Sequence, residues 1–563
     1  MATFVRISAL IWADLLAAFA MYVMMTYLTN VWKLSTTHAA GIINIWNGIT
    51  PVLAFAFAFI VDTFMGDFYM LIISSISYSV GLGLLTMSTP AISGPCKQDD
   101  KKCIGHAQKV LFYTALPLIA VGMAGHMVSL APFLDLQTRN KNERDVEKKK
   151  KKENERKKNE NENGKENKPG EESEEENKIF LQIPGLIMVM IVVMAGGIGL
   201  PYVRPWKLRF GIPAICSVLA TLLFFTGWRY YDRDPPKGSP LTTTVRVFVA
   251  TARNFSKPMP NPTDLYNEND THPTSSLRLF DKAAIKLPEG QQPNRWKVCD
   301  VREVEDTKIG IRLLPMWLTF IVVGIVLSIG NTYYLEQANH MDRKLGKIKV
   351  TIPIFLLFYT TTSSIFARFY SLLTMTTKKY APPIGIATGM ILSVLCCITA
   401  AKVETRRLHR IRDHDLLDKP SDKIPMSIFA LLPQFMLLAA VDGIANTSIT
   451  GFFRHQTPES LHKYLIYFTK GVLGLGSMAS VLSVYIVGKV SEKNGKRNWF
   501  QYTLNQSRLD RYYWVLAALS AVNLVVYVFV ALFYKYKETP EGDEDEAEGG
   551  EMREDFQERT CCC

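Results

Sequence analysis

The chain has 563 residues, of which 48% are hydrophobic and 21% charged, and its formal net charge is +12. The charges are grouped in a few blocks and leave about a dozen apolar runs of the roughly 20 residues that a membrane-spanning helix needs. This distribution excludes a soluble globular protein. Lys and Arg lie mostly in loops and at helix ends, which favours contact with lipid head groups over nucleic acid. Because only helices and closed barrels satisfy their backbone groups in lipid, we expect an all-α membrane protein.

The first apolar run covers residues 7–28, and a single acidic residue, Asp14, interrupts it. A carboxylate near the middle of a membrane helix costs about 2.5–3.5 kcal/mol, so such a residue usually faces a protein interior or a wet cavity. Ala9, Ala13 and Ala17 form a small-residue stripe that suits close contact with another helix. We therefore expect Asp14 to point into a helical bundle. We also expect no cleavable signal peptide, because the run is long and lacks a small-residue cleavage site.

Further apolar runs follow along the chain in two groups of six, separated by a polar stretch. The predicted spans are 7–28, 40–60, 68–88, 109–136, 179–200, 208–228, 311–330, 351–375, 383–402, 426–450, 463–488 and 512–534. Twelve helices in two six-helix halves are typical of the major-facilitator fold. In that fold the two halves rock around a site near the middle of the membrane.

The chain divides into four units with different compositions. An N-terminal six-helix bundle (1–228) contains a charged low-complexity insertion (138–178), which has too few apolar residues to fold. A central loop (229–310) precedes the C-terminal six-helix bundle (311–537), and an acidic tail (538–563) ends the chain. We expect the termini, the insertion and the central loop on the cytosolic side. The basic loop 403–422 then lies outside, against the positive-inside tendency.

The cysteines suggest two modifications. Cys96 and Cys103 share one short loop and are candidates for a disulfide if that loop faces outside. The chain ends in Cys561, Cys562 and Cys563, which do not form a prenylation box. These three are candidates for S-acylation, and the alternative is an unmodified tail.

Several sequence strings resemble those of the plant nitrate/peptide transporter family, the plant branch of the proton-dependent oligopeptide transporters. The strings are AAGIINIWNG (39–48), DTFMGD (62–67), FGIPA (210–214), GSPLT (238–242), IRLLPMW (311–317), VETRRL (403–408), MSIFALLPQ (426–434), GFFRHQTP (451–458) and RLDRYYW (508–514). The resemblance covers nearly the whole chain outside the insertion and the tail. It implies a major-facilitator transporter that moves a small solute.

The chain departs from this family pattern where the family carries charge. In the family an ExxER motif in the first helix takes up and releases protons. Aligned on residues 26–29, this chain has Leu10, Ala13 and Asp14 at the Glu, Glu and Arg positions. Met127 and Gly451 stand where the family has its fourth-helix lysine and tenth-helix glutamate, and Asp67 stands where it has an arginine. Proton coupling by the usual motif is therefore in doubt.

Ionisable residues that remain inside the predicted spans are our candidates for substrate binding or proton coupling. They are Asp14, His126, Arg368, Asp442 and Lys470. At 1.5 Å per helical residue, four of them lie roughly 10–12 Å from the cytosolic ends of their helices and His126 lies deeper. Similar depths on different helices indicate a shared cavity. The alternatives are structural ion pairing or helix capping for Asp442 and Arg368, a packing role for His126, and snorkelling to the head groups for Lys470.

Aromatic and amide side chains are weaker candidates for lining the cavity. They are Tyr22, Trp46, Asn331, Gln434 and Asn446. Trp317 and Tyr334 also fit such a site, but Trp and Tyr anchor helices at membrane interfaces as well, and that reading is favoured for these two.

The sequence thus predicts a transporter of a small polar organic solute by alternating access, and the family resemblance implies a nicotianamine-like chelator or a small peptide as the first expectation. The alternatives are a nitrate or hormone transporter of the same family, or a receptor or scaffold on the same fold. We expect no enzyme, no cofactor, no metal site and no nucleic-acid partner. We place the protein in the plasma membrane or an endomembrane, in contact with lipids and a small-molecule substrate, with its oligomeric state open.

Overall fold

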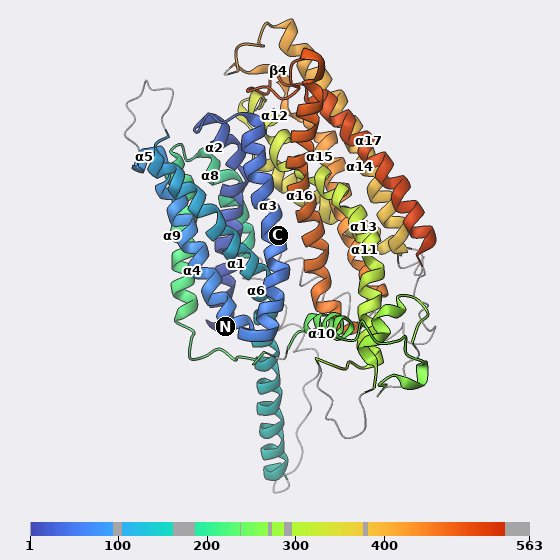
Figure 1. Cartoon of the computed structure of the whole chain (residues 1–563). Coiled ribbons are helices and arrows are strands. Elements are labelled where there is room, and N and C mark those ends of the chain that lie inside the picture. The colour runs from blue at the N-terminus through green and yellow to red at the C-terminus, as the bar shows by residue number, and fades with distance from the viewer. Residues whose placement is uncertain are drawn as a thin grey trace.

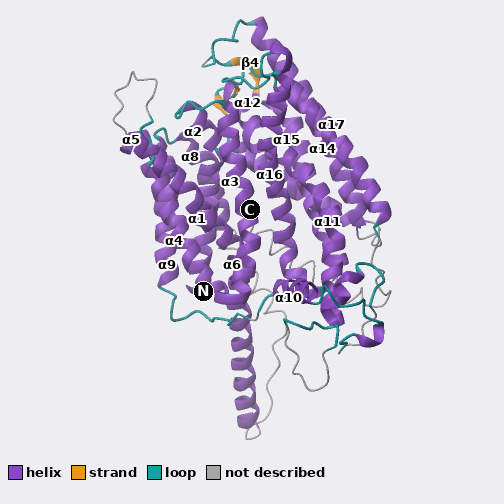
Figure 2. Ribbon diagram, viewed as in Figure 1, coloured by secondary structure: helices purple, strands orange, loops and turns teal. Residues whose placement is uncertain are grey.

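The computed structural model of the protein is built almost entirely of helices (Figure 2). Two long bundles stand side by side, and short strands lie at one end (Figure 1). The structure describes residues 2–93, 104–160, 185, 187–236, 238–267, 273–286, 296–374, 381–420 and 422–534.

The helices of the N-terminal half are α1 (Ala2–Tyr22), α2 (Met24–Asn30), α3 (Thr36–Ile60), α4 (Gly66–Met87), α5 (Pro90–Ser93), α6 (His106–Glu160), the helix Ile187–Tyr202 with α8 (Leu200–Tyr202) at its end, and α9 (Trp206–Phe225). The central segment contains α10 (Pro240–Arg253). The C-terminal half consists of α11 (Val301–Ser328), α12 (Leu335–His340), α13 (Ile354–Thr374), α14 (Ala381–Asp413), α15 (Leu432–Gln456), α16 (His462–Ser491) and α17 (Leu509–Phe533).

Among the described residues, nine helical stretches are long and apolar enough to cross a membrane. One of them, Thr36–Met87, contains both α3 and α4. The helix Ile187–Tyr202 and α13 supply the two remaining predicted spans. The prediction of an all-α protein with twelve spans in two six-helix halves is therefore confirmed. α13 carries a run of hydroxyl-bearing residues, Thr360–Ser364, and the charged Arg368 within its length.

Within each half, a few helix pairs make most of the contacts. α4 packs on α6 and α9, and α1 packs on α9. In the other half α14 packs on α15 and α17, and α13 packs on α15. A large buried cluster runs through both halves, with Tyr27 and Trp46 from the first and Tyr334 and Phe435 from the second. Burial of this apolar surface against neighbouring helices fixes the arrangement in which the candidate site is assembled.

The two halves approach each other most closely where α3 crosses α16. A Cβ atom added to Gly474 would lie 2.6 Å from the carbonyl oxygen of Gly48, and one added to Gly48 would lie 2.5 Å from that of Gly474. Asn44 Nδ2 donates a hydrogen bond of 2.9 Å to Ser480 Oγ one turn away. Small residues thus let the two backbones touch, as is common between membrane helices.

Short strands and loops close the end of the molecule opposite the N-terminus (Figure 1). Strand β1 (Met341–Asp342) pairs in parallel with β4 (Ile424–Ser427), with Met341 opposite Ile424. Strand β2 (Lys344–Leu345) pairs antiparallel with β3 (Ile348–Lys349). We call this the outer end, following the expected orientation, and the opposite end the inner end.

The inner end holds α10, the start of α11 and the lower part of α6 (Figure 1). Ser239 caps α10, because its hydroxyl accepts a hydrogen bond from the Leu241 backbone N–H. α11 begins at Val301, ten residues before the predicted span, and its Lys308 is fully buried between Asp281 and Glu305. The central segment is therefore partly folded against the C-terminal half.

The first part of the charged insertion is helical, although the sequence predicted disorder there. α6 leaves the bundle and continues as helix to Glu160, which takes it past residue 138, where the insertion begins. Arg144 pairs with Asp232, and Gln137 exchanges hydrogen bonds with the Asp232 backbone, so the segment after α9 supports this helix. Lys and Glu residues three and four apart also favour a helix, because oppositely charged side chains at this spacing attract each other. Overall composition does not reveal this spacing. Residues 161–178 lie outside the described residues.

Candidate functional site

Asp14 lies within a chain of three hydrogen-bonded side chains in the N-terminal half. Its Oδ2 atom is 2.7 Å from Nδ1 of His126 on α6, and Nε2 of His126 is 2.8 Å from the Ser75 hydroxyl on α4. The His126 side chain is 4% exposed and that of Asp14 is 27% exposed. The structure thus brings together two of the residues singled out in the sequence. Asp14 is partly exposed, and His126 is buried.

This arrangement is suited to holding and releasing a proton. An imidazole with one nitrogen on a carboxylate and the other on a hydroxyl has a fixed ring orientation, and it gains charge near physiological pH more readily than any other side chain. The edge of the Tyr78 ring faces His126 at 5.6 Å between centroids. Among the described residues, Asp14 Oδ1 is buried without a hydrogen-bond donor, which leaves it able to accept one.

Asp442 is the centre of a second polar group, in the C-terminal half. Ser363 on α13 donates a hydrogen bond of 3.0 Å to its Oδ2 atom, and Asn446 one turn later on α15 donates to Oδ1. The Tyr359 hydroxyl and the Lys470 ammonium also face this carboxylate. Lys470 thus interacts electrostatically with Asp442, and its role as a counter-ion stays a prediction.

Tyr22 of the N-terminal half approaches the second polar group across the boundary between the halves. It lies on α1, two turns above Asp14, and is close enough to Tyr359 of α13 to interact with it electrostatically. Tyr359 in turn faces Asp442. Tyr22 therefore lies at the boundary between the halves and Asn446 beside Asp442, and their lining of a cavity stays a prediction.

Arg368 lies on α13 beside a hollow of about 310 Å³ lined by Thr360, Thr361, Ser364, Ile365 and Arg368. The Arg368 side chain is exposed within a membrane span. The structure therefore places the five ionisable candidates in three groups: Asp14 with His126, Asp442 with Lys470, and Arg368 at the hollow.

The other predicted cavity-lining residues have different surroundings. Trp46 is buried, with its indole N–H donating to the Leu116 carbonyl oxygen 3.2 Å away. Gln434 is fully buried and donates to Gln337, which itself donates to Glu404, so it belongs to a closed chain of hydrogen bonds. Buried N–H groups need acceptors, and packing within each half supplies them to the Trp46 indole N–H and to the Gln434 amide nitrogen. Asn331 is exposed in a π-helical turn, Gly330–Tyr334, at the end of α11.

Trp317 and Tyr334 lie inside the bundle. Trp317 stacks on Phe468, with 5.2 Å between ring centroids. Tyr334 is fully buried, with its hydroxyl 3.5 Å from the sulfur of Cys396. Cys96, Cys103, Cys561, Cys562 and Cys563 lie outside the described residues.

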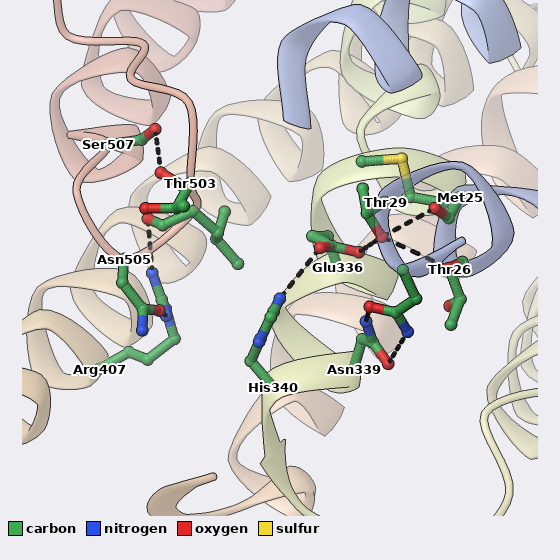
Figure 3. A network of polar contacts seen from close by, with 12 residues as sticks. Met25, Thr26, Thr29, Glu336, Asn339, His340, Arg407, Thr503, Asn505 and Ser507 are labelled. Atoms are coloured by element: carbon green, nitrogen blue, oxygen red, sulfur yellow. Dashed lines mark hydrogen bonds and ion pairs between the residues drawn. The ribbon is translucent and has the colours of Figure 1, made fainter. Parts of the chain in front are cut away.

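Hydrogen bonds join the two halves at the outer end (Figure 3). The Thr29 hydroxyl donates to Glu336 Oε2 at 3.0 Å, and the other oxygen of Glu336 is 3.0 Å from Nε2 of His340. Asn30 and Asn339 exchange two hydrogen bonds beside this contact. Glu336 is 2% exposed. Its carboxylate is therefore buried at the outer end, where Thr29 and His340 are its hydrogen-bond partners. We call this contact the outer latch.

Replacing Thr29 with Val is expected to loosen the outer latch. The change removes a hydrogen bond to a charged group, worth about 1.5–3 kcal/mol, and should raise the outward-open population roughly tenfold or more. Spin labels at His38→Cys and Lys347→Cys, both exposed at the outer end of opposite halves, would report longer distances.

The matched control is Thr405→Val, whose hydroxyl donates to the Ala401 carbonyl oxygen of its own helix. An unchanged distance distribution in Thr29→Val would show that the latch does not hold the outer end closed.

At the inner end, Asp62 connects the halves. It pairs with Lys463, accepts a hydrogen bond of 2.6 Å from the Tyr464 hydroxyl, and Tyr464 is 2.7 Å from Ser239 of the central segment. Asp67 stands nearby, at the start of α4. Burial raises the pKa of Asp67, the nearby Lys463 ammonium opposes this, and the Asp62 and Asp234 carboxylates add to it.

The raised pKa of Asp67 predicts an effect on stability. A carboxyl group whose pKa is higher in the folded protein stabilises the fold below its unfolded pKa, and this contribution is lost as pH rises through the folded value. Asp67→Asn is therefore expected to raise the melting temperature at pH 7.5 by about 2 °C and to change it little at pH 4. Thermal unfolding in detergent at both pH values would measure this, and a lower melting temperature at pH 7.5 would contradict it.

Sequence reasoning missed the neutral partners of the charged residues. Ser75, Ser363 and Tyr359 look like ordinary polar residues of membrane helices, and hydroxyls there usually bond to their own helix. Glu336 and His340 were missed because they follow the seventh predicted span. Their spacing of four residues on one helix was the available signal.

Two six-helix halves that stand side by side, with polar side chains near their boundary, have the arrangement of a membrane transporter of the major-facilitator fold. The family model that matches, over residues 174–500, is that of the POT family. Protein NRT1/ PTR FAMILY 5.5 of Arabidopsis thaliana is 38% identical over 553 residues, with 94% of this chain and 96% of that protein covered. Protein NRT1/ PTR FAMILY 5.12 of the same plant is 30% identical over 536 residues, with coverages of 91% and 88%.

The chain therefore belongs to the POT family, with the plant NRT1/PTR proteins among its relatives. It is a multi-pass membrane transporter of peptides or small solutes and not an enzyme. An auto-inhibited POT family peptide transporter shares its fold, with a TM-score of 0.61 and 14% identity, covering 96% of this chain and 99% of that one. The POT family transporter PepTSo is similar at a TM-score of 0.61 and 15% identity, with coverages of 94% and 97%.

Proposed function

We propose that this transporter moves a small polar organic solute by alternating access and couples the movement to a proton held by Asp14 and His126. The first candidates are an amino-acid-derived chelator such as nicotianamine and a small peptide. The observation that carries the proposal is the hydrogen-bonded chain from Asp14 through His126 to Ser75, with a free acceptor at Asp14 Oδ1. This chain of side chains supplies a titratable group in a protein whose residues 10, 13 and 14, aligned with the family's ExxER motif, are Leu, Ala and Asp.

The contacts between the halves support alternating access. The outer latch and the inner contacts of Asp62 are both made of hydrogen bonds and ion pairs between groups that water can also solvate. Such contacts can break at one end while the α3–α16 crossing stays packed. The region that holds the two polar groups, at Asp14 and Asp442, then opens first to one side of the membrane and next to the other.

Flux into proteoliposomes tests this function. The purified protein would be given radiolabelled nicotianamine, a dipeptide, nitrate and 5-aminolevulinic acid, the last because one structurally similar POT family transporter was solved in complex with it. We expect uptake of at least one organic solute, stimulated by an inward proton gradient. No flux of any solute would favour a receptor, and uptake independent of the gradient would remove the coupling role of Asp14.

The same assay separates the substrate alternatives. Preference for nitrate over the organic solutes would support the nitrate alternative. We propose that the protein lies in the plasma membrane or in an endomembrane. Microscopy of a fluorescent fusion protein would show which of the two it is.

A further inference from the structure

Residues 273–286 of the central segment fold against the start of α11 at the inner end (Figure 1). Glu305, Lys308 and Arg312 of α11 follow one another by three and four residues, so they share one face of the helix. The two oxygens of Glu305 accept hydrogen bonds from the Thr274 backbone N–H at 3.0 Å and from the Thr274 hydroxyl at 2.7 Å. The Lys308 ammonium donates to the Thr274 carbonyl oxygen at 3.3 Å. This face of α11 therefore holds the central segment at Thr274.

The Arg312 guanidinium has only hydroxyl partners within the described part of the chain. Its Nη2 atom donates to the Thr274 hydroxyl at 2.7 Å and also to the Ser276 hydroxyl. Its Nε atom is buried and has no acceptor among the same residues. A guanidinium binds a phosphate or carboxylate with two parallel N–H groups, and these charge-assisted bonds are stronger than bonds to neutral hydroxyls. Arg312 therefore keeps the capacity to bind an oxyanion where the two hydroxyls lie.

The two hydroxyls at Arg312 differ in what else they contact. The Thr274 hydroxyl accepts from Arg312 and donates to Glu305, so an anionic group on Thr274 would face a carboxylate. Ser276 is exposed, and its hydroxyl accepts from Arg312. Among the described residues, the Ser276 hydroxyl donates no hydrogen bond in return. Ser276 is therefore the hydroxyl that can carry an anionic group beside this arginine.

We propose that Ser276 is a phosphorylation site and that Arg312 holds its phosphate. A protein kinase supplies ATP as the co-reactant. The Ser276 oxygen forms a bond to the γ-phosphorus, the bond from that phosphorus to ADP breaks, and the hydroxyl proton passes to the base of the kinase. The product carries a charge of about −1.5 to −2 and three strong acceptor oxygens, which favours charge-assisted bonds with a neighbouring arginine. The inner end is the end expected in the cytosol, where ATP is present.

The phosphate fastens a segment that reaches the inner contact between the halves. The short helix η4 (Arg278–Ala284) follows Ser276 and packs on α10 and α11. α10 is capped by Ser239, whose hydroxyl is 2.7 Å from that of Tyr464, which donates to Asp62. A phosphate bound to Arg312 therefore adds a link between α11 and the segment that includes this contact. The inference goes beyond the proposed function, because it requires no transported solute.

Phosphorus NMR tests whether Arg312 holds the phosphate. The full-length protein, with phosphoserine encoded at position 276, would be titrated with pH in a maltoside detergent, which contains no phosphorus. We expect the second pKa of the phosphate to fall from about 6 to about 5, because the guanidinium favours the doubly charged form. Arg312→Gln should return this pKa to about 6. Arg312→Lys should give an intermediate value, because Lys keeps the charge but not the paired hydrogen bonds.

The matched control is phosphoserine encoded at position 275, since Ser275 is also exposed and is the neighbour of Ser276. Its phosphate should keep a pKa of about 6 with and without Arg312. A pKa at position 276 that Arg312→Gln leaves unchanged would overturn the role of Arg312.

Mass spectrometry tests whether the site is used in cells. The protein would be expressed in plant cells and purified with phosphatase inhibitors, and its peptides would be examined for phosphate. We expect phosphate on Ser276 and none on Thr274. Protein without phosphate on Ser276 would overturn the modification site itself. Neither measurement involves flux, so the failure of this inference and the failure of the proposed function are distinguishable.

Discussion

Asp14→Asn is expected to lower proton-driven uptake about 10- to 100-fold and to flatten its dependence on pH. Asparagine keeps the size of the side chain but cannot form the charged hydrogen bond with Nδ1 of His126, which spans 2.7 Å in the wild type. Such a bond is worth about 1.5–3 kcal/mol. Without the carboxylate, the imidazole loses its charged hydrogen-bond partner, and the pair keeps only one of its two ionisable groups.

The measurement is uptake into proteoliposomes at several external pH values with the internal pH fixed. Solute exchange without a gradient should change much less, because the solute is moved by the same rocking halves. Asp14→Glu restores a carboxylate and should recover part of the pH dependence. His126→Gln should resemble Asp14→Asn, since it removes the other half of the pair.

Asp413→Asn is the matched control, because Asp413 is exposed at the end of α14. Its pH profile should match that of the wild type. A wild-type pH profile in Asp14→Asn would place proton uptake elsewhere, and Asp442 would be the next residue to replace. Loss of exchange together with coupled uptake would instead indicate that Asp14 contributes to solute binding.

The fold could be predicted from the sequence because the bilayer imposes a strong and regular pattern. Each span needs a long apolar run, and such runs are visible without any knowledge of packing. Even α13 was located, although its hydroxyls and Arg368 lower its hydropathy. The helical continuation of α6 was not expected, because composition measures how much apolar surface a segment can bury and does not register local helix-forming pairs.

The candidate site could be predicted only in part. Charge inside an apolar span is a strong signal, and it marked Asp14, His126, Asp442 and Lys470 without showing how they pair. The pairing of Asp14 with His126 depends on the rotation of α1 against α6, which no single-sequence pattern specifies. Trp46 and Gln434 carry polar groups that pack inside their own halves, so polarity alone did not distinguish a cleft wall from a satisfied interior.

Gly474→Ala is expected to disrupt the contact between the two halves and to reduce flux more than tenfold. The added methyl group would lie 2.6 Å from both the Gly48 carbonyl oxygen and Pro51 Cγ, and the carbonyl oxygen is backbone that cannot turn away. The helices must separate, and overpacking of this kind costs about 1–3 kcal/mol. We expect a lower melting temperature as well as lower flux, since the crossing of α3 and α16 holds the halves together while both ends open and close.

Gly471→Ala, one turn earlier on α16, is a matched control with the opposite expected sign. Its added methyl group would meet nothing closer than the Pro51 carbonyl oxygen at 3.9 Å, an ordinary contact. Alanine also favours the helix by about 1 kcal/mol over glycine, so this variant should be equally or more stable and fully active. The pair separates steric contact from helix propensity, because propensity changes identically at both positions. Equal effects of the two substitutions on melting temperature and flux would show that the close approach of α3 and α16 is not required for transport.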